Sequence, residues 1–214
     1  MTTKKLKKLG KKIKKSNKKF RRATPEQKRV LIAKDVLKEL AAESFITING
    51  RWVVAEQNIV TEKELEDNAQ LSVALKRLPQ CEVCAIGGMF IAAVKRYNKI
   101  QCQGLFDPYS CSALGYSDYT HSETAALFGF LEKFFTPKQL SMIEVAYEGD
   151  AAGSNTSILS QNERDKVLEF HSNNGNACEM PDDTLEEKDE KRIESKLCMK
   201  AIMENIVDNG EFAP

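Results

Sequence analysis

Two cysteines separated by two residues, Cys81 and Cys84, are the side chains of this chain most suited to chemistry. A Cys-x-x-Cys pair at a helix start is typical of redox dithiols, because the helix N-terminus lowers the thiol pKa. Such pairs usually follow a strand of a βαβ unit, and the surrounding pattern lacks that unit. A second hypothesis makes Cys84 a nucleophile with His121 as its base. A third places zinc on Cys81 and Cys84, although the second close pair of ligands that thiolate zinc sites usually have is missing.

The same segment also has a purely structural interpretation, which we favour. Residues 81–97 are almost entirely apolar and small, which predicts a buried helix whose cysteines pack as small hydrophobic side chains. Gly87 and Gly88 would then let a neighbouring helix approach closely. We therefore expect no catalytic residue, no metal and no cofactor. Cys84 and His121 remain the alternative catalytic candidates, and Cys81 and Cys84 the alternative metal ligands.

A basic N-terminal arm is the most unusual feature of the composition. Its twelve basic side chains come with no acid among the first 22 residues. The remaining residues hold 20 basic and 31 acidic side chains, so a near-neutral total hides a cationic arm on an anionic body. Such an arm is attracted to nucleic acid, an anionic membrane or an acidic protein surface. The candidate nucleic-acid-binding residues are Lys4, Lys5, Lys7, Lys8, Lys11, Lys12, Lys14, Lys15, Lys18, Lys19, Arg21 and Arg22.

The arm also has a helical pattern. Leu6, Leu9, Ile13 and Phe20 fall on one stripe, and lysines occupy the other faces. Gly10 and the crowded like charges weaken that helix. We expect an arm that is disordered alone and folds on contact with a polyanion. A membrane-binding helix and a solubilising tail without a partner are the alternatives.

The composition predicts a cytoplasmic globular protein. A length of 214 residues with 42% hydrophobic and 29% charged residues suits one domain with appendages. No run of about 18 apolar residues predicts a transmembrane helix. The lysines interrupt any apolar core of a secretory signal, so free thiols are expected.

The periodicity predicts an α+β fold that is mainly α-helical. Thr24 and Thr61 begin capping boxes, the second opening a helix to about Leu78. Two apolar runs around Asn49-Gly50 predict one β-hairpin at about 45–54. Residues 98–120 are expected to form a loop.

The second half of the chain contains further helices. They are expected at 122–135, 136–149, 161–170 and 184–207, with a glycine-rich linker after residue 149. Leu197, Ile202, Ile206 and Val207 should bury the end of the last helix, and Phe212 should fold back onto it. The predicted organisation is a basic arm (1–23), a helical core domain with the hairpin (24–149), a linker with an acidic insertion (150–194) and a docked C-terminal helix (195–214).

Two stretches carry a resemblance to a known group of sequences. Residues 81–90 read CEVCAIGGMF and resemble a C-x-V-C-A-x-G-[AG]-x-F signature in small uncharacterised proteins of tailed phages and related bacterial genomes. Residues 201–214 resemble their IMxNIIxNxGxFxP terminus, and residues 134–149 resemble their middle helix. The resemblance implies a phage or mobile-element source and a place in the host cytoplasm or the virion. The family has no established activity, so no catalytic role follows.

Together these features favour a non-enzymatic, phage-encoded accessory protein that binds nucleic acid or another polyanion through its arm. A cysteine-dependent enzyme or zinc protein centred on Cys81 and Cys84, and a peripheral membrane protein, are the other hypotheses. The acidic stretch 179–194 is expected to be a solvated face, or else to contact the arm within the chain or in a neighbouring copy.

Overall fold

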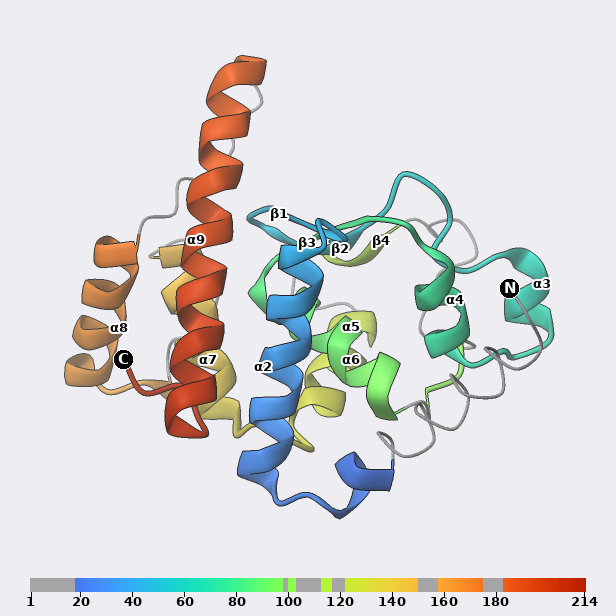
Figure 1. The fold of residues 1–214 in the computed structure, drawn as a ribbon, viewed down its shortest axis with the longest axis horizontal. Coiled ribbons are helices and arrows are strands. Elements are labelled where there is room, and N and C mark those ends of the chain that lie inside the picture. Colours follow the sequence, from blue (N-terminus) through green and yellow to red (C-terminus); the bar gives the residue numbers. More distant parts are fainter. Residues whose placement is uncertain (1–17, 98–99, 103–112, 117–121, 150–157, 175–182) are drawn as a thin grey trace.

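The computed structural model describes residues 18–97, 100–102, 113–116, 122–149, 158–174 and 183–214. Its helices are α2 (Pro25–Ala41), α3 (Glu62–Glu66), α4 (Leu71–Arg77), α5 (Ala85–Tyr97), α6 (Ser122–Leu131), α7 (Pro137–Glu148), α8 (Gln161–Asn174) and α9 (Leu185–Asn209). Its strands are β1 (Phe45–Thr47), β2 (Arg51–Val54), β3 (Cys81–Val83) and β4 (Ala113–Tyr116). The prediction of a mainly helical α+β fold is confirmed (Figure 1).

The four strands form one small mixed sheet in the order β1-β3-β2-β4. β3 pairs in parallel with β1 and antiparallel with β2, and β4 pairs antiparallel with β2. The predicted hairpin at 45–54 is therefore wrong: both segments are strands, but β3 lies between them. Asn49-Gly50 does turn the chain, with φ of 72° at Gly50. Strand β3 lies between β1 and β2, and its Val83 side chain is completely buried. A two-stranded hairpin would have no place for β3.

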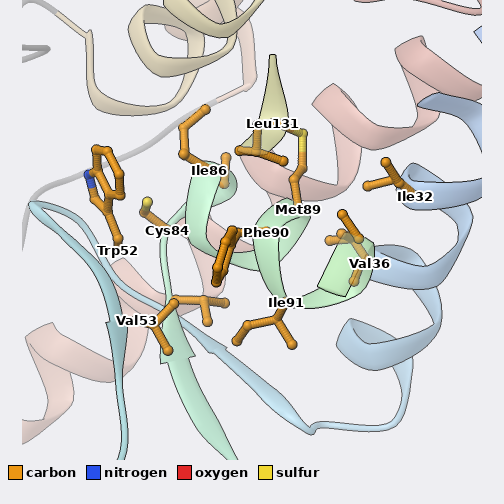
Figure 2. Packing of buried hydrophobic residues seen from close by; sticks show 14 of the residues in the cluster. Ile32, Val36, Trp52, Val53, Cys84, Ile86, Met89, Phe90, Ile91 and Leu131 are labelled. Atoms are coloured by element: carbon orange, nitrogen blue, oxygen red, sulfur yellow. The ribbon is translucent and has the colours of Figure 1, made fainter. Parts of the chain in front are cut away.

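Helix α5 packs against α2, α4, α6, α7 and the strands β2 and β3. Figure 2 shows its Met89 and Phe90 among side chains of α2, α6 and β2. Seven of its side chains from Ile86 to Val94, glycines aside, are at most 2% exposed. The predicted helix over 81–97 is wrong at its start, because residues 81–83 form β3. The close neighbour of Gly87 is a strand rather than a helix. A Cβ on this glycine would lie 1.7 Å from the carbonyl oxygen of Trp52 in β2.

Threonines begin four of the helices, through capping boxes at Thr24, Thr61, Thr136 and Thr184. The helix predicted from Thr61 to Leu78 is instead divided into α3 and α4. Asn68 has φ of 45° between them, and Gln70 forms a bridge with Gln101. The segment predicted as a loop over 98–120 therefore contributes a bridge and strand β4.

Helices α2 and α9 run antiparallel and pack against each other, so the start of α2 lies beside the end of α9 (Figure 1). Arg29 of α2 donates from Nε to the carbonyl oxygen of Gly210 at 2.7 Å and from Nη1 to that of Phe134 at 3.1 Å. Gly210 ends α9 in the left-handed conformation. Phe212 folds back as predicted and is 2% exposed, with its ring 5.2 Å from that of Phe170 in α8. Leu197, predicted to be buried, is instead 55% exposed.

Helix α9 is continuous across residue 194, so the acidic segment and the docking segment are two parts of one helix. Its second part is buried through Cys198, Met199, Ile202, Met203 and Ile206. Helix α8 packs against α7, which places part of the predicted insertion against the core. None of the helices formed by the described residues has the length and hydropathy to cross a bilayer.

Candidate nucleic-acid interface

The end of the basic arm is fixed to the body by Phe20. Residues 18–22 form a short helical turn, and the Phe20 side chain is completely buried. Its ring lies 5.6 Å from that of Phe134, and the Arg96 guanidinium lies over it at 5.9 Å. Arg96 is held in turn by an ion pair with Asp35 of α2. Phe20, which the sequence analysis placed on the apolar stripe of the arm, is thus part of the hydrophobic core.

Anchoring of Phe20 leaves its basic neighbours in solvent. Lys18, Lys19, Arg21 and Arg22 are all exposed. Three of them line a groove of about 810 Å³ against the first half of α2, which we call the cationic groove. Its lining side chains include the cations Lys18, Lys19, Arg22 and Lys34, the apolar Val30 and Leu31, and the carboxylate of Glu26.

The charge of the cationic groove favours an anion. Four cations face one carboxylate, and the Glu26 carboxylate lies 3.6 Å from the buried guanidinium of Arg29. Lysines and arginines on one face are the electrostatic footprint of phosphate binding. The structure therefore brings together Lys18, Lys19 and Arg22 from the predicted set and adds Lys34, which the sequence did not single out. The cations from Lys4 to Lys15 lie outside the described residues.

The predicted thiol site has a different environment. Cys84 directly precedes α5 and is 3% exposed, and its Sγ accepts a hydrogen bond from the Gly87 N–H at 3.5 Å (Figure 2). Burial, together with the nearby Glu148 carboxylate, raises the pKa of the Cys84 thiol far above its ordinary value. Burial raises the pKa of Cys81 to about 11. Both groups are therefore held as thiols, which makes them poor nucleophiles at neutral pH.

The proposed partners of Cys84 are not seen with it. His121 lies outside the described residues. His171 belongs to α8, where its Nδ1 lies 3.1 Å from the carbonyl oxygen of Ala146. Among the described residues, no group of three or more His, Cys, Asp or Glu side chains is arranged to hold a metal ion. The packing interpretation accounts for the described cysteines.

A pair of acidic side chains in α7 was missed by the sequence reasoning. Glu144 is 6% exposed, and burial raises its pKa to about 7. Burial also raises the pKa of Glu148 to about 8, although the N–H of Gly50 donates to its carboxylate at 3.1 Å. The available signal was their spacing of four residues in a stretch of α7 that is otherwise uncharged from Leu140 to Tyr147, and this spacing puts both on one face. Both carboxyl groups lie near the buried Cys84 thiol and raise its pKa, so they disfavour the thiolate.

Comparisons with known proteins return no family model, no curated protein and no solved structure similar to this chain. The basis for a function is therefore the chain's own charge and geometry. The cationic groove and the arm that ends in it form the strongest concentration of like charge, whereas Cys81 and Cys84 are buried and their pKa values are raised.

Proposed function

We propose that this protein binds nucleic acid through the phosphates, using the basic arm from Lys4 to Arg22 together with the cationic groove. The observation that carries the proposal is the anchoring of Phe20. It fixes Lys18, Lys19 and Arg22 on the surface beside Lys34, so that four cations are held ready before binding. Cations that are already positioned lose less conformational entropy on contact than those of a free tail.

The rest of the arm extends this footprint. Eight further lysines precede residue 18 without an intervening acid. A cationic segment binds a phosphate backbone by replacing condensed counterions, so its binding is sensitive to salt and tolerant of sequence. We accordingly propose a non-enzymatic accessory role in the cytoplasm, in a phage-infected host if the resemblance of residues 81–90 and 201–214 reflects origin.

The test compares two triple variants by fluorescence anisotropy with a short labelled DNA duplex. The first is Lys18→Gln, Lys19→Gln and Arg22→Gln. The control is Lys63→Gln, Lys76→Gln and Lys166→Gln, which removes the same charge from exposed positions away from the groove. We expect the first to lower the slope of log K against log salt by roughly two to three and the control to change it little, since each phosphate contact contributes about 0.9.

Deletion of residues 2–16 tests the arm while keeping Phe20 in place. We expect the deletion to remove most of the DNA affinity that the cationic groove does not supply. Equal losses in the two triple variants, or an unchanged affinity after the deletion, would contradict the proposal. Co-sedimentation with anionic lipid vesicles is the companion measurement. If the deletion abolishes vesicle binding and leaves DNA binding intact, the arm is a membrane element instead.

A further inference from the structure

The N-terminal part of α9 extends beyond the body of the protein (Figure 1). No residue from Leu185 to Glu194 is buried, and the buried positions of the helix begin at Ser195. Contact with the sheet is made at Arg192, whose carbonyl oxygen accepts from Thr47 Oγ at 2.9 Å. Its guanidinium also lies 3.5 Å from the Glu82 carboxylate. The exposed side chains of this projecting segment could therefore contact another chain.

The face of α9 that points away from the core has a helix-pairing pattern. Glu186, Glu190, Ile193 and Leu197 follow one another at spacings of four, three and four residues, which places them along one side of the helix. Ile193 is 60% exposed and Leu197 is 55% exposed. Asp189 and Glu194 stand beside this row. Carboxylates lie beside the apolar pair and toward the N-terminus of the helix, whereas Lys196 and Lys200 lie toward its C-terminal side, where Lys200 pairs with Glu204. The face therefore keeps a negative net charge, which suits an amphipathic helix of positive charge.

The chain itself contains such a segment. Leu6, Leu9 and Ile13 recur at spacings of three and four residues, and lysines fill the positions between them. We propose that the outward face of α9, formed by Glu186, Glu190, Ile193 and Leu197, binds residues 4–16 of a second copy of the chain. The proposal rests on the proposed function, because the docked segment is the one that binds nucleic acid.

The second copy is favoured over the same chain by distance. The anchor at Phe20 leads into the start of α2, and Arg29 there contacts Gly210, at the opposite end of α9. Seventeen residues separate Ile193 from Gly210, or about 25 Å of helix at about 1.5 Å per residue. Ile13 is only seven residues from Phe20, and most of the length before the anchor is needed for the docked helix itself. When the arm binds α9 of a second copy, it does not have to span the length of α9 within its own chain.

Docking would regulate the arm, because the lysines facing the acids of α9 are then unavailable to phosphate. Nucleic acid and the second copy compete for one segment, so each weakens the apparent affinity for the other. The contact combines two apolar side chains per face with exposed charges, and exposed charges are screened by salt. We therefore expect association at low ionic strength and dissociation as salt or DNA is added.

The experiment uses the double variant Ile193→Gln and Leu197→Gln, with Val73→Gln and Ile158→Gln as the control. The control positions are 57% and 47% exposed and lie outside α9, so both variants remove exposed apolar surface and should keep the fold. Analytical ultracentrifugation at low salt should give a dimer for the wild type and the control. The α9 variant and the 2–16 deletion should be monomers.

A labelled peptide of residues 1–17, titrated onto the 2–16 deletion, measures docking directly. We expect the α9 double substitution in that background to weaken peptide binding by about tenfold or more. In the full chain it should raise the apparent DNA affinity. A monomeric wild type, or peptide binding that is insensitive to the α9 substitutions, would overturn the docking proposal. Peptide docking that depends on Ile193 and Leu197 in a protein that binds no DNA would uphold docking and reject the proposed function.

Discussion

The carboxylate of Glu148 accepts a hydrogen bond from the backbone N–H of Gly50 at 3.1 Å, so the end of α7 holds the turn between β1 and β2. The preceding residue, Tyr147, donates from its hydroxyl to the carbonyl oxygen of Ile48 at 3.0 Å. Ser195 of α9 donates to Asn49 at 3.1 Å. Two helices thus fix three successive residues of the turn. This explains why its geometry depends on tertiary contacts rather than on a hairpin.

Burial of Glu148 and Glu144 predicts that the protein becomes less stable as pH rises. Folded-state pKa values of about 8 for Glu148 and about 7 for Glu144 exceed the ordinary value of 4.5. Between these limits the folded chain holds protons that the unfolded chain has released, so the free energy of unfolding falls as pH rises through that window. The slope should be on the order of 1 kcal/mol per pH unit for each carboxyl.

Urea unfolding at several pH values checks this, with Glu148→Gln as the test and Glu169→Gln, at an exposed site of α8, as the control. The amide keeps an oxygen for the Gly50 N–H but does not titrate. We expect Glu148→Gln to flatten the pH dependence and to exceed the wild type in stability above about pH 8. A wild-type stability that stays flat or rises over this range would show that the two carboxyls are ionised in the fold.

Phe20 should contribute to the stability of the fold, whereas residues 2–16 should not. Removal of a buried phenylalanine costs about 3–5 kcal/mol, so Phe20→Ala should lower the free energy of unfolding by roughly that amount. Deletion of residues 2–16 should leave it unchanged, whereas deletion of residues 2–22 should resemble Phe20→Ala. Thermal melts of the three proteins provide the measurement. Equal midpoints for the two deletions would mean that Phe20 adds nothing to the core.

Gly87 and Gly129 form a matched pair of helical glycines. A Cβ at Gly87 would meet the Trp52 carbonyl oxygen at 1.7 Å, whereas a Cβ at Gly129 in α6 meets nothing within 4 Å. Gly87→Ala should force α5 from β2 and break the 3.2 Å hydrogen bond from Cys84 N–H to that carbonyl. We expect a loss above about 3 kcal/mol or an insoluble product. Gly129→Ala should gain about 0.5–1 kcal/mol. A Gly87→Ala protein that melts like the wild type would refute the close approach.

Cys84 should behave as a packing residue. Its thiol is buried and its pKa is raised, so alkylation of the native protein, followed by peptide mapping, should leave it unmodified until the fold opens. Cys84→Ala should cost on the order of 1 kcal/mol and leave DNA affinity unchanged. Rapid alkylation of Cys84 in the native state, or stoichiometric zinc that disappears in the variant, would restore the catalytic or metal hypothesis.

Local signals in the sequence determined many of the helices and their ends. Capping threonines at 24, 61, 136 and 184 and the glycine at 210 act within one turn of chain, so they can be recognised without the rest of the protein. The strand segments 45–47 and 51–54 were recognisable for the same reason. The arm's charge is a property of composition and needed no structure.

Pairing and burial were decided only by the tertiary structure. Asn49-Gly50 marks a turn but does not specify which strands pair, and the distant strand β3 took the place between β1 and β2. Phe20 belongs to the core rather than to the arm because its ring packs against Phe134 and Arg96. Leu197 is exposed because the buried face of α9 lies on the opposite side of the helix. Glu144 and Glu148 took raised pKa values from the apolar layers around α7. Each of these depends on contacts between residues far apart in the chain. Hydrophobic periodicity indicates which face of an element is buried but not which other element packs against it.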